Sequence, residues 1–503
     1  MDSENSRMIN TETGIEPDEN KSRTSIWSQT TEVQERLPLS GNREVDVAVI
    51  GGGMAGLLTA YLLQQKGRQV IVLEAARIGS GQTRNTTAKI TSQHGLVYDK
   101  LTRKYGFQNA RLYARANEEA ISMYEKIVQQ RQIDCDFQRL PSYLYSTQDR
   151  EVLQAEARAA ARLGLPASFQ ESTALPFATV GAVCFEHQAQ FHPLKFLSGI
   201  AKDLEIYERT MVYSVKGHKV RTSHGMVTAR HIVFATHYPF PVIPGFYFAR
   251  QHQERSYAIA YTGTKLPDGM YYSIDDMGLS FRSYKDLLII GGGGHRTGRQ
   301  EAGGSYEFLR MQAKQYFPEA VEEACWSAQD CISHDMLPFI GTYSCLRPYW
   351  YVSTGFKKWG MTFSMLSAMI ISDRICGVEH PYQKVFTPQR WHSIVSARAF
   401  FLDLGISIKG LLAGYHFLTS AREEDLKPGH GGIVRKGGKR YGCYRDLQGE
   451  VHRISLRCPH MGCELLWNPD ELSWDCPCHG SRFDYDGNLI DNPAQKHKKD
   501  VLE

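Results

Sequence analysis

The stretch Val45-Asp46-Val47-Ala48-Val49-Ile50-Gly51-Gly52-Gly53-Met54-Ala55-Gly56 decides the fold of this chain. Its apolar run ends in the pattern G-x-G-x-x-G, the apolar-periodic segment Met54–Gly67 follows, and a second apolar run, Gln69–Ala75, comes next. Short apolar runs on both sides of a segment with helical periodicity predict a strand, a helix and a second strand. The sequence therefore predicts a βαβ unit with a glycine-rich first turn.

The spacing of the glycines in this turn indicates a dinucleotide site. Gly51 allows a sharp turn, Gly53 lets a pyrophosphate approach the backbone, and Gly56 lets the helix pack closely on the strand. The phosphates are expected at the helix N-terminus, beside Met54 and Ala55, where free N–H groups and the helix dipole favour negative charge.

Glu74 closes the second predicted strand, close to the spacing at which an acidic side chain accepts a hydrogen bond from a ribose hydroxyl. An acid at this position disfavours a 2′-phosphate, which argues against NADP. The motif alone leaves FAD and NAD open, and a glycine-rich turn without a ligand is a further alternative.

Three later segments, Ala76–Gly95, Ala229–Phe240 and Ser353–Ile370, resemble in their order the D-amino-acid oxidase-like flavoproteins, across roughly residues 44–380. This resemblance implies FAD as the cofactor. It implies an α/β Rossmann-like FAD-binding domain with an α+β substrate subdomain. It also implies flavin contacts at Gln82, Thr83, Thr86, Thr87, Ala88, Val212, Ala235, Thr236, Gly355, Gly360, Met361 and Thr362.

The catalytic residues stay unknown at this stage. Relatives that act on amino acids hold the substrate carboxylate with a basic residue, and Thr362 stands where one such lysine is found. The side chains that could serve instead, each with a surface or core role as the alternative, are Lys357, Lys358, His94, Arg282 and His295. Cys331 is a remote candidate for a covalent link to the flavin.

A second glycine run, Leu287–Gly298, does not predict a nicotinamide site. Arg296 stands where the third glycine of the motif is required, and no helix with a following acidic strand is apparent. The resemblance instead implies a turn at the end of a strand that borders the active site. Electrons are therefore expected from an organic substrate.

Cysteine and histidine residues cluster near the C-terminus in the boxes Cys458-Pro-His460-Met-Gly-Cys463 and Cys476-Pro-Cys478-His479-Gly-Ser481. The boxes resemble those of Rieske proteins, which implies a [2Fe–2S] cluster with Cys458 and Cys476 on one iron and His460 and His479 on the other. Such ligation raises the potential to about −150 to +300 mV. The resemblance also implies a disulfide between Cys463 and Cys478. A structural zinc site is the alternative, because its ligands have similar spacings.

Hydrogen bonds to cluster sulfurs raise the potential of such a centre. Ser481 matches the hydroxyl donor of the Rieske family, whereas Phe483 stands where high-potential members often have tyrosine. We therefore predict a potential below that of the respiratory Rieske centres, although Tyr485 could partly compensate.

Composition changes along the chain predict its division into domains. The charge run, proline and glycines of AREEDLKPGHGG indicate a linker, and short strand-like pieces follow it. Helical patterning dominates residues 100–163 and returns in 383–420. The expected parts are a flexible or loosely docked leader (1–43), the FAD-dependent oxidoreductase (44–420, with a substrate subdomain at about 251–319), the linker (421–432) and a small all-β Rieske domain (433–503).

The bulk composition excludes several functional classes. Fifty-eight basic and 54 acidic residues give a net charge of +4, so nucleic acid is a poor candidate partner. The polar N-terminus predicts no signal peptide, and no apolar stretch reaches the ~20 residues that a membrane span needs. Cysteines outside the two boxes are scattered singly, which favours a reducing compartment, and we expect a cytoplasmic protein.

Together these features predict an enzyme that oxidises a small organic substrate at a C–N bond, as a dehydrogenase rather than an oxidase. Electrons would pass singly to the Rieske cluster and on to an external acceptor or donor protein. The alternatives are an electron-transfer protein without an organic substrate and a redox sensor. A Rieske oxygenase is disfavoured because it needs a separate mononuclear iron domain.

Overall fold

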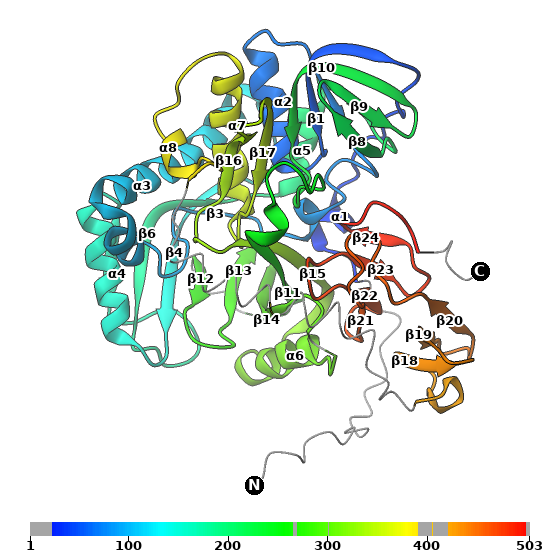
Figure 1. Cartoon of the computed structure of the whole chain (residues 1–503). Coiled ribbons are helices and arrows are strands. Elements are labelled where there is room, and N and C mark those ends of the chain that lie inside the picture. Colours follow the sequence, from blue (N-terminus) through cyan, green and yellow to red (C-terminus); the bar gives the residue numbers. More distant parts are fainter. Residues whose placement is uncertain (1–22, 265–268, 300, 391–404, 406–420, 499–503) are drawn as a thin grey trace.

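The computed structural model describes residues 23–264, 269–299, 301–390, 405 and 421–498. Figure 1 shows a sheet with helices in the upper half of the view, a second large sheet below it, and the small C-terminal strands packed beside the second sheet. The predicted combination of an α/β flavoprotein fold with a small all-β domain is confirmed.

The first sheet has the Rossmann-like order β16-β17-β10-β1-β2-β7, with β9 paired to β10 and β8 paired to β9. Strand β1 runs parallel to β2 and β10, which places the predicted βαβ unit at the centre of the sheet. The bounds are β1 (Arg43–Ile50), β2 (Val70–Leu73), β7 (Glu205–Tyr207), β8 (Val212–Lys216), β9 (Lys219–Thr222), β10 (Gly225–Phe234), β16 (Phe339–Ser344) and β17 (Arg347–Thr354).

Alternation along β1 explains how this sheet is covered on both faces, because successive side chains of a strand point to opposite sides. Val47 and Val49 join the core cluster of helices α2 (Met54–Gln65) and α7 (Gly360–Ile375). Ala48 and Ile50 join a second cluster that includes apolar residues of β8, β9 and β10. The glycine-rich turn thus leads from the buried C-terminal half of a strand into a mostly buried helix.

The second sheet has the order β15-β11-β14-β13-β12-β4-β6-β3, with β5 on β6. It extends well beyond the predicted subdomain of 251–319, because β4 and β6 join it from far earlier in the chain. Its strands are β3 (Lys89–Ile90), β4 (Gln138–Ser146), β5 (Ala167–Gln170), β6 (Gly181–Gln190), β11 (Gln251–Thr262), β12 (Met270–Ser273), β13 (Ser280–Tyr284), β14 (Leu287–Arg296) and β15 (Val321–Ser333).

Strand β4 also interrupts the stretch 100–163, in which helical patterning dominates. The strand was not predicted because the helical sequence pattern of α3 and α4 on either side of it is much longer than its own alternating pattern. The remaining helices are α3 (Tyr98–Arg131), α4 (Arg150–Arg162), α5 (Pro193–Ala201), α6 (Ser305–Tyr316) and α8 (Gln383–Phe386), with 3-10 turns η1 (Gln82–Asn85), η2 (Tyr247–Ala249) and η3 (Glu423–Asp425). Most of the predicted helical extension at 383–420 lies outside the described residues.

The described part of the predicted leader is anchored to the fold at a few residues. Helix α1 (Ile26–Thr30) buries Ile26 and Trp27 completely, and the Trp27 indole N–H donates a hydrogen bond to the carbonyl oxygen of Thr86 at 2.7 Å. Farther along, the Leu39 N–H donates to the Thr210 hydroxyl at 3.0 Å. These few anchoring residues could not be recognised from the sequence because the residues around them are polar. The prediction for residues 1–22 lies outside the described chain.

The C-terminal domain consists of two small antiparallel sheets. The predicted linker is part of it, because β18 begins at His430 and Glu423 forms an ion pair with Arg453. The strands are β18 (His430–Lys436), β19 (Lys439–Arg445), β20 (Val451–Ile454), β21 (Leu466–Asn468), β22 (Ser473–Asp475), β23 (Arg482–Asp484) and β24 (Leu489–Asp491).

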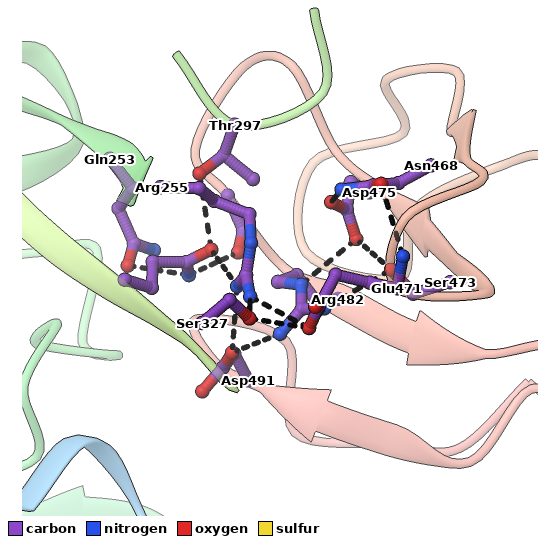
Figure 2. A network of polar contacts seen from close by, with 12 residues as sticks. Gln253, Arg255, Thr297, Ser327, Asn468, Glu471, Ser473, Asp475, Arg482 and Asp491 are labelled. Carbon is purple, nitrogen blue, oxygen red and sulfur yellow. Dashed lines mark hydrogen bonds and ion pairs between the residues drawn. The ribbon is translucent and has the colours of Figure 1, made fainter. Parts of the chain in front are cut away.

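A buried network of charged and amide side chains joins this domain to the second sheet (Figure 2). Arg255 of β11 is 1% exposed and pairs with Glu471 at 2.9 Å. Arg482 pairs with the same carboxylate at 3.3 Å, and also with Asp475 and Asp491, each at 3.0 Å. A guanidinium buried this deeply is tolerated only if it is paired and hydrogen-bonded. The two domains therefore share one electrostatic core.

Glu471 is the carboxylate that both guanidinium groups contact. Burial alone would raise its pKa, but Arg255 and Arg482 lower the pKa of Glu471 to about 2. A lowered pKa in the folded state stabilises the fold above the ordinary carboxyl pKa of about 4.3. This contribution is lost as the pH falls from there towards about 2.

The substitution Glu471→Gln is expected to destabilise the protein strongly. It leaves Arg255 and Arg482 short of a counter-charge in a buried site, which costs about 3 kcal/mol. The matched control is Glu171→Gln, because Glu171 is 70% exposed and its pair with Arg150 is worth under about 1 kcal/mol. Denaturant unfolding followed by absorbance of the C-terminal domain measures the difference. Equal midpoints for the two variants would contradict the role of the network.

Candidate functional site

A cavity of about 770 Å³ lies where the glycine-rich turn meets the second sheet. Its volume falls in the range typical of cofactor and ligand sites. The structure brings together in its lining many of the sequence-predicted residues: Gly51, Gly53, Met54, Ala55, Glu74, Gln82, Thr83, Thr86, Thr87, Val212, Ala235, Thr236, Gly360 and Met361. Six segments that are separate in the sequence thus converge on one space.

The other four predicted flavin residues are outside the described lining, but each is next in sequence to a residue of that lining. They are Gly56, Ala88, Gly355 and Thr362. A methyl group on Gly56 would lie 1.9 Å from the carbonyl oxygen of Gly51, so only glycine fits there. The Thr362 hydroxyl donates to the carbonyl oxygen of Thr91 at 2.8 Å and accepts from its N–H at 3.0 Å. Ala88 and Gly355 take positive φ values of 57° and 74°. The two hydrogen bonds of Thr362 therefore hold the loop at Thr91 in place.

The turn before α2 has the shape that a dinucleotide requires. Gly51 has φ 107°, and a methyl group there would lie 2.4 Å from the carbonyl oxygen of Ala235. The Thr83 hydroxyl accepts from the Met54 N–H at 3.0 Å, which fixes the loop over the helix N-terminus. Glu74 accepts from the Gly52 N–H at 2.6 Å. The strand, the turn and the helix N-terminus therefore fit a pyrophosphate with a ribose beside Glu74.

Lysine side chains gather in another part of the cavity lining. Lys89, Lys357 and Lys358 line it, together with Asp330 and Tyr272. Burial, together with the charge of Arg282, lowers the pKa of Lys89 to about 7. The pKa of Lys358 is raised, mainly by Tyr272, whereas burial raises the pKa of Asp330 to about 7. This cationic lining suits an anionic group on a ligand.

Three of the five candidate catalytic side chains have structural roles. The His94 ring contacts the Thr91 carbonyl oxygen and the Tyr113 hydroxyl, each at 2.7 Å. Arg282 donates to the side-chain oxygen of Gln190 at 2.7 Å. The His295 ring contacts the Tyr257 hydroxyl at 3.0 Å.

Only Lys357 and Lys358 of that candidate set belong to the described lining of the cavity. The Cys331 thiol lies 3.4 Å from the carbonyl oxygen of His237, and burial raises its pKa. Cys331 is also outside the described lining, so the geometry does not favour a covalent link through it.

The glycine run at Leu287–Gly298 lies mainly within a strand and not in a turn at its end. Strand β14 continues through it and pairs with both β11 and β13. Gly291, Gly292 and Gly294 line the cavity, so the run borders the active site as expected. A methyl group on Gly291 would lie 2.8 Å from the Ser280 hydroxyl oxygen, and one on Gly292 would lie 3.1 Å from Leu279, so neighbouring side chains leave little space for a larger residue.

The two cysteine and histidine boxes form adjacent loops. A disulfide joins Cys463 and Cys478, the pair expected from the resemblance. The rings of His460 and His479 lie 4.9 Å apart. Burial lowers the pKa of His460 to about 4, so its ring is neutral, as a metal ligand requires.

The sulfur ligands also meet in this site. A hydrogen bond from Cys476 lowers the pKa of Cys458. The backbone N–H of Ala494 donates to the Ser481 hydroxyl oxygen at 3.0 Å, and the hydroxyl in turn contacts the Cys458 sulfur. Phe483 is buried, and the ring of Tyr485 lies against Tyr444 and His452. Ser481 is thus the hydroxyl that reaches a cluster ligand.

Comparison with known proteins matches residues 46–374 to the family described as FAD dependent oxidoreductase, and residues 416–501 to the Rieske [2Fe-2S] domain. The chain belongs to the FAD-dependent oxidoreductase family. It is 36% identical over 494 residues to YhfW of Bacillus subtilis (strain 168), which is named as a Rieske 2Fe-2S iron-sulfur protein, and the match covers 95% of this chain and 97% of YhfW.

Part of the chain also resembles a characterised oxidoreductase. Gamma-glutamylputrescine oxidoreductase of Escherichia coli (strain K12) is 28% identical over 207 residues, which cover 38% of this chain and 48% of that protein. Glycine oxidase from Geobacillus kaustophilus superposes with a TM-score of 0.60 at 17% identity, over 70% of this chain and all of that one. L-proline dehydrogenase from P. horikoshii gives 0.57 at 17% identity, over 70% of this chain and 98% of that one. These structures share its fold.

The family and its second domain establish the cofactors as FAD and a [2Fe–2S] cluster of the Rieske type. The zinc alternative is thereby wrong, because the Rieske match covers both ligand boxes. No helix among the described residues is long and apolar enough to cross a membrane.

Sequence reasoning missed one group of cavity residues altogether. They belong to the Rieske domain and are Leu489, Ile490, Asp491, Asn492, Ala494, Gln495 and His497. Local sequence carries no sign of this role, because the contact joins segments more than 200 residues apart. Lys89 and Asp330 were also missed, although Lys89 directly follows the predicted segment Thr86–Ala88.

Removal of the Ser481 hydroxyl is expected to lower the potential of the cluster. Ser481→Ala removes a hydrogen bond that favours the reduced, more negative state, and one bond of about 1.4 kcal/mol corresponds to about 60 mV for one electron. EPR-monitored redox titration of the full chain measures the shift. Tyr485→Phe is the matched control, since the Tyr485 ring packs against Tyr444 and His452. A Ser481→Ala potential equal to that of the wild type would contradict this role.

Proposed function

We propose that this protein oxidises a C–N bond of a small amine or amino acid, as a dehydrogenase, and passes the electrons singly to its own Rieske cluster. FAD supplies two-electron oxidation and the cluster supplies one-electron transfer when both are bound. The chain itself contributes a substrate-binding end of the cavity and a fixed route from the cavity to a cluster ligand.

The observation that carries this proposal is a short relay of amide groups. Gln329 lines the cavity, and its amide nitrogen donates to the carbonyl oxygen of Gly480 at 2.8 Å. The same nitrogen donates to the Gln253 side-chain oxygen at 2.7 Å. The Gln253 amide nitrogen then donates to the carbonyl oxygen of His479, also at 2.7 Å. A single amide side chain therefore separates the cavity from a cluster-ligand loop.

The cationic lining of the cavity supports an anionic substrate group. Of the lysines in its lining, Lys89 and Lys357 have a pKa that burial lowers, whereas Lys358 stays protonated because its pKa is raised. A substrate carboxylate would pair with such a group, which orients the neighbouring C–N bond. The partial match to a relative named for an amine substrate agrees with this class.

The two histidine ligands differ in exposure, which supports an external electron acceptor. His479 is 4% exposed and faces the flavoprotein domain, whereas His460 is half-buried and is followed by Met461, which is 40% exposed. One ligand thus points towards the cavity side and the other towards solvent. A separate acceptor or donor protein could approach the second ligand.

A carrier without an organic substrate is the second candidate. That function would fit a cramped or wholly polar cavity, but apolar side chains also line this one, including Phe356, Trp359 and Met361. We therefore favour an enzyme. We also place it in the cytoplasm, because Cys135, Cys184 and five other cysteines outside the ligand boxes are free thiols, as in reducing compartments.

Anaerobic stopped-flow mixing of the full chain with a panel of secondary amines and amino acids tests the function. We expect one class to bleach the flavin, followed by bleaching of the cluster. Flavin bleaching with a persistently oxidised cluster would contradict transfer between them. No flavin bleaching by any member of the panel would instead favour the carrier.

Gln329→Leu is expected to slow the second phase of this reaction and leave the first unchanged. The substitution removes the amide that joins the cavity to Gly480, and a loss of roughly tenfold corresponds to about 1.4 kcal/mol of barrier. Gln148→Leu, at an exposed position, is the matched control. A slower first phase with an unchanged second phase would contradict the relay.

A further inference from the structure

We infer that the Rieske domain is part of the FAD-binding site and retains the dinucleotide in its cavity. This inference rests on the assignment of FAD to the cavity, but not on any substrate or on electron transfer. It assigns the site to two domains of this chain.

The first support is the wall of the cavity. The segment Leu489–His497 contributes to the same lining as the glycine-rich turn and the Thr83–Thr87 loop. It comprises β24 and the chain that follows it. The Rieske domain therefore supplies part of the cavity wall.

The second support is the way the wall is fastened. The Asn492 amide nitrogen donates to the backbone carbonyl oxygens of Thr236 at 2.7 Å and Tyr238 at 2.8 Å. The Gln82 amide nitrogen donates to Asp491 at 2.9 Å. Thr236 and Gln82 themselves line the cavity, so the wall is hydrogen-bonded to the predicted flavin-binding segments.

Charge compensation makes this wall compatible with a pyrophosphate. Asp491 would repel a phosphate group if it stood alone, but Arg482 pairs with it at 3.0 Å and Arg255 lies 3.9 Å away. These two guanidinium groups also pair with Glu471 and Asp475, and they reduce the repulsion that Asp491 would exert. The buried network that joins the domains therefore also reduces the negative charge of the cavity wall.

The third support is the close fit of the domains beside the cluster loop. A methyl group on Gly298 would lie 2.6 Å from the backbone nitrogen of Pro477, and one on Gly480 would lie 2.7 Å from the Gln253 Cβ. Neither contact can be relieved without moving the Pro477 backbone or the buried Gln253 side chain. The docked position thus leaves little freedom for the wall to move.

Gly298→Ala separates the wall from the cavity in the full chain. The added methyl group meets the Pro477 backbone and forces the domains apart. The matched control is Gly304→Ala, since Gly304 also has a positive φ, of 91°, but nothing lies within 4 Å of the added methyl group. Both variants carry the same type of backbone strain. Gly304 lies at the same interface, since its N–H donates to Asp470 at 2.9 Å, but only Gly298→Ala adds a steric clash.

The measurement is the release of FAD from the diluted holoprotein, followed by the rise of free-flavin fluorescence without substrate. We expect Gly298→Ala to release FAD about tenfold faster than wild type, and Gly304→Ala to stay within about twofold. The EPR signal of the cluster shows that the Rieske domain remains folded.

Asn492→Ala is the second variant, in case Gly298→Ala loses its cluster. It removes the two contacts to Thr236 and Tyr238 without a steric clash, and we expect release about fivefold faster than wild type. Release at the wild-type rate in Asn492→Ala, or equal acceleration in Gly298→Ala and Gly304→Ala, would overturn the inference. Because no substrate is present, failure of the proposed C–N oxidation leaves this result unaffected.

Discussion

The buried guanidinium of Arg255 is the constraint on which the two-domain structure depends. It belongs to the flavoprotein sheet, yet its carboxylate partner Glu471 belongs to the Rieske domain. If the domains separated, the charge of Arg255 would lose this partner. In the docked arrangement, burying Arg255 without this carboxylate would cost several kcal/mol, which is large compared with the marginal stability of a folded domain. The Rieske domain is therefore held against the flavoprotein domain and is not simply tethered to it.

Docking in this register has direct functional consequences. It places the His479 loop against Gln253 and Gln329, and it places Asn492 on the backbone beside the cavity. The same face thus serves the route to the cluster and the wall of the flavin site. Binding of a dinucleotide and docking of the second domain then stabilise each other, since linkage between two such equilibria is reciprocal.

Local chemistry explains which parts of the structure could be predicted. Gly51 and Gly56 were predictable because close backbone contacts admit only glycine. The Rieske domain was predictable because its two boxes carry cysteine and histidine at specific spacings. The segment from Trp27 to Leu39 was missed because its anchors are few and its surroundings polar. The extent of the second sheet was missed because β4 and β6 join it from distant sequence.

The contribution of Asn492 and Gln253 could not be derived from sequence for the same reason. Each is an ordinary polar residue within its own segment, and each gains its role only when β11 and the cluster loops meet. Arg282 and His94 show the converse. Each is a residue type suited to catalysis, but its side chain forms hydrogen bonds within the protein instead. Partners that are remote in sequence decide such roles.

Rapid-freeze EPR of the full chain mixed anaerobically with a reducing amine or amino acid tests the central claim most directly. The account predicts that the signal of a reduced histidine-ligated [2Fe–2S] centre grows in within a single turnover, at a rate that follows flavin reduction. A reduced flavin beside a cluster that stays EPR-silent until dithionite is added would contradict it.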